Sequence, residues 1–314
     1  MSSDAGLLLI KEFISKLGIE RLLNRSFKTN DSAVFRYHTD RDNLLQMIYM
    51  IMAGYFEDDA SDELTKDPIF FNRMDEDTLK QFQEISQILR KRIYSIQMPQ
   101  AVILDLDSTL LAAYGKQEGR AFNFHYRSNG YHPLVCYAGI TGDLIKIQLR
   151  DGAAYSCTGV TNFLQPILDE YLNDYPTIHL LLRGDSGFAT PDLYKQCEEN
   201  GTSYVIRLME NFIKESKSGF DFSAVSSHNR IVNANRVQVH ALAYNIFNWF
   251  RRLVLSAKMR KQRIDTVRLK LLKIATKVVH SARYITFKLC SSCPYKEEFY
   301  DTLSAIGKLN VQLE

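Results

Sequence analysis

The chain has 314 residues, of which 46% are hydrophobic, and its formal net charge is only +3. This length and composition are enough to bury a sizeable core, which excludes a wholly disordered protein. The sequence lacks both the ~18 apolar residues in a row that a membrane span needs and a secretory leader, so a cytoplasmic location is expected.

The charge is unevenly distributed along the chain. Residues 229–290 carry 14 Lys and Arg side chains and one acid, Asp265, whereas the other residues carry 25 basic and 35 acidic side chains. Such a segment is typical either of a solvated helical face or of a surface that binds a polyanion. Charge alone leaves both interpretations open.

Residues 1–98 are predicted to form a helical N-terminal region. Apolar residues recur at intervals of three and four over residues 7–23 and 42–56, and Asp42 is the expected N-cap of the second helix. A third helix is expected over residues 75–96 and ends before Pro99.

The period changes from helix to strand at Pro99, where a second region, residues 99–228, is expected to begin. Over residues 101–108 the even-numbered side chains point to one face, and the odd-numbered ones, which include Asp105 and Asp107, point to the other. Three more strands are expected, forming an antiparallel meander with turns at residues 128–131 and 140–143. These strands span residues 121–128, 132–140 and 143–151.

Strands and helices then alternate, which is typical of parallel strands covered by helices. The expected elements are a helix at 160–173, a strand at 177–185, a helix at 190–200 and a strand at 203–208. Residues 229–314 are predicted to be a basic, mainly helical C-terminal region that completes the core. Its longest helix is expected at 233–255 and its one strand-like run at 283–289.

Asp105 and Asp107 stand out because carboxylates are rare in a strand that is otherwise apolar. One explanation is a haloacid-dehalogenase-like phosphatase, in which Asp105 would be the nucleophile and Asp107 the general acid. That fold needs helical flap elements directly after the strand, whereas strands are expected here. It also needs a later acidic loop, but Asp192 lies too far beyond Asp185. The phosphatase is therefore the minor alternative.

The other explanation is an RNase H-like fold. Its order is a first strand, an antiparallel pair, a helix, and then a strand that ends in an acid. In that sheet Asp107 and Asp185 would be neighbours, and carboxylates are the ligands that Mg²⁺ prefers. The expected fold class is α/β, with an RNase H-like catalytic core, a mixed sheet of antiparallel meander plus parallel strands, and helical N-terminal and C-terminal regions.

Five segments in this order resemble one family, the DDE transposases of bacterial insertion sequences. Within it the sequence is most similar to the thirteen-eighty family of the insertion-sequence-four-like superfamily. The segments are residues 104–119, 122–137, 180–198, 209–222 and 240–253.

The resemblance implies a DNA transposase that cuts transposon ends and joins them to target DNA by metal-dependent phosphoryl transfer. Asp107, Asp185 and Glu210 would be the catalytic residues and would ligate two Mg²⁺ ions, for which Mn²⁺ can substitute. Lys217 would hold a DNA phosphate or a terminal base, and Asp105 would be a neighbour or an alternative ligand. The implied partners are double-stranded DNA, as transposon end and target, and a second copy in a homodimer on that DNA, at the bacterial nucleoid.

The resemblance also favours DNA as the partner of the basic segment, in which cations would face out and apolar residues would pack inwards. Trp249 and its aromatic neighbours are expected in the core. His125, Tyr126, Tyr131 and His132 are expected to pack at a strand edge, with a DNA contact as the alternative. The predicted DNA-binding residues are Lys217, Arg183, Arg251, Arg252, Lys258, Arg260, Lys261 and Arg263.

Two short joins depart from the family pattern. Tyr204 and Arg207 precede Glu210 with a spacing one residue shorter than the Tyr-x2-Arg-x3-Glu signature, and the insertion expected before the glutamate helix is missing. A second short join lies near residues 67–71. The sequence therefore predicts a transposase impaired by internal deletion. The alternative function is that of a DNA-binding remnant without catalysis. The alternative to Glu210 as the third acid is Glu215.

Overall fold

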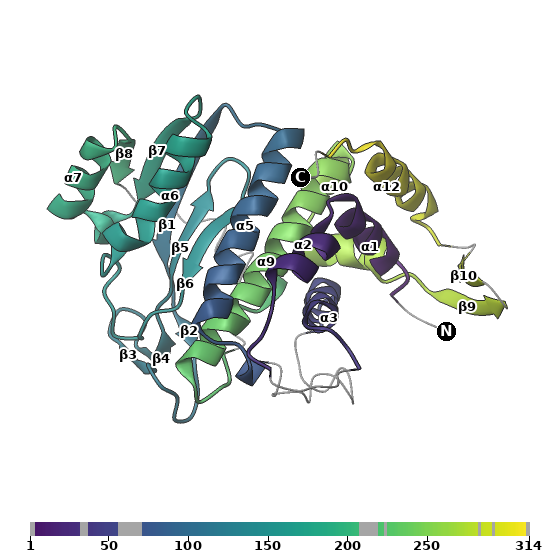
Figure 1. The fold of residues 1–314 in the computed structure, drawn as a ribbon, viewed down its shortest axis with the longest axis horizontal. Helices are drawn as coiled ribbons and strands as arrows, with labels where there is room; N and C mark the ends of the chain where they lie inside the picture. The colour runs from purple at the N-terminus through teal and green to yellow at the C-terminus, as the bar shows by residue number, and fades with distance from the viewer. Residues whose placement is uncertain are drawn as a thin grey trace.

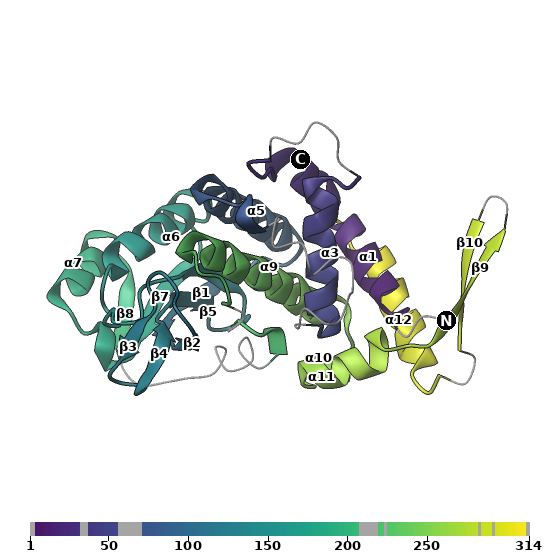
Figure 2. The same ribbon diagram turned by 90° about the horizontal axis from the view of Figure 1, so that it is seen from below.

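The computed structural model describes residues 4–31, 37–55, 71–206, 219–222, 225–281, 284–290 and 293–311. The central sheet and its helices lie at one end of the molecule, and helices from the N-terminal and C-terminal regions lie at the other end (Figures 1 and 2). The long helices α5 (Glu76–Ile96) and α9 (Arg230–Val254) run between them. The N-terminal and C-terminal regions share one core, in which the Phe13 ring meets the Phe250 ring at 5.5 Å.

The central sheet has five strands in the order β6-β5-β1-β7-β8. β1 (Ala101–Ser108) is antiparallel to β5 (Leu134–Ala138) and parallel to β7 (His179–Gly184). β6 (Leu144–Gln148) forms one edge, antiparallel to β5, and β8 (Ser203–Ile206) forms the other, parallel to β7. This is the RNase H-like arrangement expected from the sequence, and it places the strand with two aspartates at the centre of the sheet.

The residues that lie between β1 and β5 in the sequence form a second, three-stranded sheet, with the strand order β2-β4-β3. The turn expected at residues 128–131 is wrong, because these residues are a strand and the turn lies at residues 124–127, where Arg127 has a φ of 50°. Gly130 serves the close pairing of the strands, since a Cβ there would lie 2.1 Å from the Leu111 carbonyl oxygen. The strands are β2 (Leu111–Ala112), β3 (Ala121–Asn123) and β4 (Ser128–Tyr131).

The helices before and after β7 confirm the expected alternation of strands and helices. α6 (Val160–Asp174) comes before β7, and α7 (Pro191–Glu199) lies between β7 and β8. α7 begins where Pro191 supplies a helical φ and the Thr190 hydroxyl accepts a hydrogen bond from the backbone N–H of Leu193 at 3.4 Å. The sequence signal for the start of α7 is therefore local.

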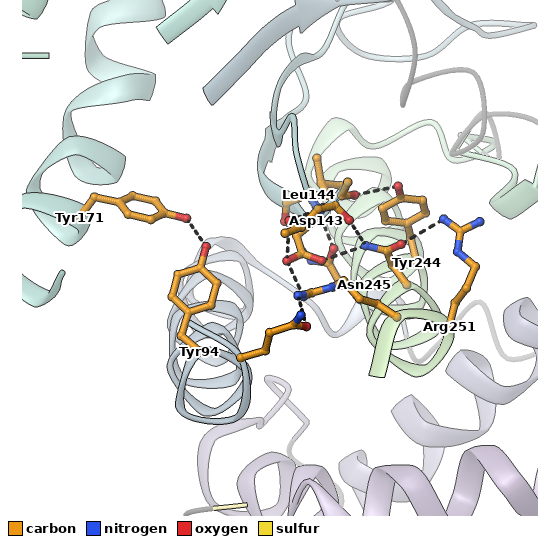
Figure 3. Close-up of polar contacts among 12 residues, drawn as sticks. Tyr94, Asp143, Leu144, Tyr171, Tyr244, Asn245 and Arg251 are labelled. Atoms are coloured by element: carbon orange, nitrogen blue, oxygen red, sulfur yellow. Dashed lines mark hydrogen bonds and ion pairs between the residues drawn. The ribbon is translucent and has the colours of Figure 1, made fainter. Parts of the chain in front are cut away.

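Helix α9 closes the β6 edge of the sheet with side-chain amides. The Asn245 amide accepts a hydrogen bond from the Leu144 backbone N–H at 2.8 Å and donates one to the Leu144 carbonyl at 2.9 Å (Figure 3). Gln238 donates to the Ile147 carbonyl at 2.8 Å. An open strand edge exposes unpaired backbone groups, and these amides satisfy them much as a sixth strand would.

Two predictions for the N-terminal helices need correction. The helix expected over residues 7–23 is broken at Gly18, which has a φ of 65°. The helix expected over residues 42–56 is capped by Thr39 rather than by Asp42. Asp42 is the partner of Thr39 in a capping box, in which each side chain accepts a hydrogen bond from the other residue's backbone N–H, both at 3.2 Å. The helices are α1 (Leu7–Lys16), α2 (Ile19–Ser26) and α3 (Asp40–Ala53).

The C-terminal region is less helical than the sequence predicts. The strand expected at residues 283–289 is confirmed as β10, but residues 276–281, expected within a helical run, form its antiparallel partner β9. Trp249 is buried, as expected. The elements after α9 are α10 (Ala257–Arg260), α11 (Ile264–Val267), a π-helical turn (Arg268–Leu272), β9 (Thr276–Ser281), β10 (Tyr284–Leu289) and α12 (Lys296–Lys308).

One cation of the basic segment is buried, contrary to the prediction that its cations face out. Arg268 is 5% exposed and donates to the carbonyls of Met52 and Ile51, at the C-terminal end of α3, and to that of Gly219. Carbonyls at a helix end have no partner within the helix, so an arginine satisfies them. Within the described ranges, no helix has the length and apolar character of a membrane span.

Candidate active site

The two aspartates of β1 lie on its less buried face. Exposure alternates along the strand, so that Asp105 and Asp107 are half-buried while Leu104 and Leu106 are buried. This confirms the two-residue periodicity expected from the sequence. The Asp107 carboxylate accepts a hydrogen bond from the Ser108 backbone N–H at 2.6 Å, which holds it at the end of the strand.

Asp185 lies beside Asp107, at the end of the neighbouring strand. In the parallel pairing of β1 with β7, Asp105 is opposite Arg183, so Asp107 and Asp185, each two residues further on, reach the same level. Asp185 opens a 3₁₀ turn and accepts a hydrogen bond from the Gly187 backbone N–H at 2.8 Å. The topology thus brings together two carboxylates that are far apart in the sequence.

Asp105 is held by Arg183 in a two-pronged ion pair. The Arg183 Nε and Nη2 atoms donate to the two carboxylate oxygens, both at 2.6 Å, and this hydrogen bonding raises the pKa of Arg183. Gly139 leaves room for the pair, since a Cβ there would lie 2.5 Å from the Asp105 Oδ2 atom. Both carboxylate oxygens of Asp105 therefore accept hydrogen bonds from Arg183, whereas a nucleophile needs an oxygen that can attack the substrate.

This pairing and the fold give no support to the phosphatase alternative. Strands β2 to β5 follow β1 where that fold would place helical flap elements, and β1 has an antiparallel neighbour. Arg183, predicted to bind DNA, instead forms an ion pair with the Asp105 carboxylate.

A serine pair connects the ends of the two acidic strands. The Ser108 hydroxyl donates to the Ser156 hydroxyl at 2.9 Å. Ser156 also borders the turn that follows Asp185, because a Cβ on Gly187 would lie 3.1 Å from the Cβ of Ser156. The loop that carries Ser156 therefore lies between the neighbour of Asp107 and the turn of Asp185.

Arg150 holds that loop in place. It is 7% exposed, and its Nη1 atom donates to the carbonyls of Tyr155 (3.1 Å), Ser156 (3.1 Å) and Thr158 (2.7 Å), while Nε donates to that of His132 (2.9 Å). Burial lowers the pKa of Arg150 to about 10, so it remains cationic at neutral pH. Sequence reasoning missed Arg150 and Ser156, because contacts to loop carbonyls leave no periodic pattern.

The resemblance implies Mg²⁺-dependent DNA cleavage, and we expect Arg150→Lys to lower the rate of that reaction by about 100-fold and to raise the Mg²⁺ concentration needed for half-maximal rate. One ammonium group cannot hold four carbonyls in this geometry, and a displacement of about 1 Å at a reacting centre has this order of effect. The measurement is a Mg²⁺ titration of the cleavage rate. Arg92→Lys is the matched control, because Arg92 is also buried and donates to the carbonyls of Leu17 and Gly18. An unchanged Mg²⁺ requirement would contradict a positioning role.

The donor set of the site fits a hard divalent cation. Asp107 and Asp185 supply carboxylate oxygens, and magnesium sites in proteins are commonly built from one or two carboxylates completed by water and substrate phosphate. Across the part of the chain that the structure describes, no group of three or more His, Cys, Asp or Glu side chains is close enough to hold a metal. The predicted third acid Glu210, its alternative Glu215 and the predicted DNA contact Lys217 lie outside the described residues.

The sequence model of one family, described as Transposase DDE domain group 1, matches the chain over residues 1–72, 70–209 and 208–311. The chain belongs to this DDE transposase family. The three matched segments meet near residues 70–72 and 208–209, where the sequence also indicates missing residues. No curated protein sequence matches the chain.

Two solved transposase structures resemble this DDE transposase chain at low identity. One is a piggyBac transposase synaptic complex with hairpin DNA, with 15% identity and a TM-score of 0.31, in which 65% of this chain and 50% of that chain are covered. The other is a Mos1 transposase paired-end complex with the left transposon end, with 11% identity and a TM-score of 0.26, covering 78% and 86%. The chain thus spans about half the length of the piggyBac chain.

The structure divides the predicted DNA-binding cations of this transposase into two groups. Arg252 is engaged inside the protein, where its guanidinium donates to the Asp143 carboxylate at 2.9 Å and to the Gln97 side chain at 3.2 Å. Arg251, which is half-buried, donates to Asn248 at 3.1 Å. An exposed cluster on α10 and the turn after it consists of Lys258, Arg260, Lys261 and Arg263.

The sequence of α10 explains why these four cations face solvent. The Ser256 hydroxyl accepts a hydrogen bond from the Met259 backbone N–H at 3.4 Å and so starts the helix. Met259 and Ile264 are buried, which turns the three cations between them, and Lys258 just before them, outwards. Here the expected pattern of cations out and apolar residues in is confirmed.

Proposed function

We propose that this chain is a DNA transposase that cuts transposon ends and joins them to target DNA by metal-dependent phosphoryl transfer. The observation that carries the proposal is the parallel register of β1 and β7, which, extended by two residues, brings Asp107 in β1 and Asp185 directly after β7 to one level. Strand ends are rigid supports, and the reaction needs carboxylates held at fixed spacing. The ion pair of Asp105 with Arg183 keeps a third carboxylate from competing for the same cation.

Asp107, Asp185 and Glu210 would hold two Mg²⁺ ions, for which Mn²⁺ can substitute. Bound there, the cations would stabilise the negative charge that develops on the phosphate in transfer. The position of β8 supports Glu210 as the third acid. Ile206 is the register partner of Gly184, the residue before Asp185, and lies four residues before Glu210 in the sequence.

We place double-stranded DNA, as transposon end and as target, against the exposed cluster of α10, with Arg251 and Lys217 as further contacts. Four exposed cations without an acid among residues 256–264 match the charge of a phosphate backbone. Arg183 and Arg252 are left out, because each has a carboxylate partner within the protein. The functional unit is proposed to be a homodimer on DNA, at the nucleoid in the bacterial cytoplasm.

Replacing all four cations of the α10 cluster by Ala should weaken DNA binding by at least about tenfold at 100 mM salt and reduce its dependence on salt, since each lost phosphate contact lowers the log–log slope by about 0.9. The measurement is a binding titration at several salt concentrations. The matched control removes four exposed lysines elsewhere: Lys11, Lys80, Lys195 and Lys296. Equal losses in both variants would mean that only net charge matters.

The deciding experiment is incubation of the chain with a duplex that carries the element's own end, taken from the flanking genomic DNA, with and without Mg²⁺. The expected product is a nick at the end of the element that forms only with Mg²⁺ or Mn²⁺. The second candidate, a DNA-binding remnant, is favoured by the two short joins of the family match. It predicts binding to the same duplex without a nick in either metal, and that result would replace the proposed activity.

A further inference from the structure

The hairpin formed by β3 and β4 carries two aromatic rings into solvent. Phe122 is 43% exposed and Phe124 is 86% exposed, and their rings meet edge to face with centroids 5.2 Å apart. Burying a Phe side chain stabilises a protein by about 1.5–3 kcal/mol, and this gain is mostly forgone at Phe124 and partly forgone at Phe122. Exposed aromatic residues side by side are typical of binding surfaces.

The rings stand on a rigid support. The Asn123 side chain, 6% exposed, donates to the Gly152 carbonyl at 2.8 Å and accepts hydrogen bonds from the backbone N–H groups of His125 (3.1 Å) and Tyr126 (3.2 Å). These three bonds fix the turn on both sides of Phe124. A ligand that stacks on rings already held in place loses little conformational entropy on binding.

The aromatic surface continues to the acidic strand ends. The Tyr126 hydroxyl donates to the Ser108 carbonyl at 3.3 Å, next to Asp107, and the Tyr126 ring lies edge to face with that of His125 at 4.7 Å. Tyr126 therefore lies beside the candidate metal site, two residues along the same turn from the solvent-exposed Phe124.

The charge around the rings fits nucleic acid. Residues 111–132 contain Lys116, Arg120 and Arg127 but only one acid, Glu118, whose carboxylate accepts a hydrogen bond from the Arg230 backbone N–H at 3.2 Å. Aromatic rings among cations are the usual platform for nucleic-acid bases, because every base has a π-face. Bases within a duplex are covered by their neighbours, so only a base at an end or out of the stack can be reached.

We propose that Phe122 and Phe124 form a stacking platform for an unpaired base of the transposon end, next to the phosphate held at Asp107 and Asp185. The inference rests on the proposed function, because it takes DNA as the substrate of that site. It assigns the hairpin a role that the acidic residues cannot fill, namely to recognise a frayed or single-stranded terminus rather than an intact duplex.

The test measures binding of two probes to the full chain carrying Asp107→Asn, so that no DNA is cut. One probe is a blunt duplex of the element's end, and the other ends in one unpaired 2-aminopurine nucleotide. The unpaired probe should bind about tenfold more tightly, with quenching of 2-aminopurine fluorescence on stacking. Adding Phe122→Leu and Phe124→Leu should abolish both the preference and the quenching while affinity for the blunt duplex stays unchanged. A variant that carries Phe124→Tyr in place of Phe124→Leu should recover part of the preference and part of the quenching.

Tyr300→Leu is the control, because Tyr300 is a half-exposed aromatic residue on α12. A double Leu variant that keeps the preference for the unpaired probe would overturn the platform. The platform would also be overturned if the Leu substitutions dissociated a dimer of the chain without changing the base preference, because the hairpin would then bind a second copy. Failure of the parent to bind either probe would instead overturn the proposed function itself.

Discussion

Asp107→Asn is expected to lower the rate of Mg²⁺-dependent end cleavage by at least about 1000-fold, and Asp185→Asn should do the same. Removing one carboxylate weakens cation binding and the charge stabilisation on which the reaction depends. Asparagine keeps the side-chain oxygen that accepts from the backbone N–H of Ser108 in one case and of Gly187 in the other. Folding and DNA affinity should therefore stay unchanged, and single-turnover cleavage with a parallel binding assay measures both.

Asp105→Asn is the matched control, since it removes a carboxylate from the same strand face. It should weaken the pairing with Arg183 but reduce cleavage by no more than about tenfold, because an indirect neighbour acts only through position. A stricter test replaces Asp107 by Cys and asks whether Mn²⁺ restores cleavage better than Mg²⁺, since a thiolate is a poor Mg²⁺ ligand. If Asp105→Asn proves as damaging as Asp107→Asn in a folded protein, the assignment of the metal ligands is wrong.

Glu170→Gln should lower the free energy of unfolding by about 3–5 kcal/mol, because it leaves the buried guanidinium of Arg90 without its counter-charge. The two side chains are 6% (Arg90) and 5% (Glu170) exposed and are joined by two hydrogen bonds of 2.6 and 2.8 Å between α5 and α6. Burial alone would lower the pKa of Arg90, but the Glu170 carboxylate, together with the side chains of Tyr171 and Tyr94, outweighs this effect, so the pKa of Arg90 is raised. Urea unfolding followed by circular dichroism gives the difference.

Replacing both partners by Leu should recover most of that loss, because two apolar side chains leave no buried charge. The nearby hydrogen bond between the Tyr94 and Tyr171 hydroxyls, which is 2.8 Å long, would remain to align the two helices (Figure 3). The exposed pair Lys80 and Asp77 provides the comparison, and its removal should leave the urea midpoint unchanged, because solvent screens an exposed ion pair. A double Leu variant as unstable as Glu170→Gln would show that the pair contributes specific geometry rather than charge balance.

The features predicted well from the sequence are those with a local signal. The alternation in β1 assigns Asp105 and Asp107 to one face, and the order of strands and helices makes Asp185 a neighbour of Asp107. The break at Gly18 is read poorly, because the apolar period runs through it and only its φ of 65° reveals the turn. Thr39 and Asp42 are both good caps, so the sequence offers two starting points for one helix.

The features that were missed depend on contacts between distant residues. Arg150 and Arg268 look like surface cations in the sequence, yet each is buried among loop or helix-end carbonyls. The strand at residues 128–131 contains Asn129 and Gly130, residue types that usually signal a turn. In that case the close packing of Gly130 against Leu111 outweighs the local preference.

The amides of α9 on the edge of β6 have a consequence for how the chain reaches its native state. Asn245 and its backbone partner Leu144 are 101 residues apart in sequence. During synthesis at about 5–20 residues per second, β6 therefore waits several seconds before the helix that covers it is made. For that interval the nascent sheet presents an open edge, which is the surface on which chains aggregate or recruit chaperones. A fragment ending at residue 228 would keep that edge permanently, so excising the acidic site as a separate module should yield insoluble protein.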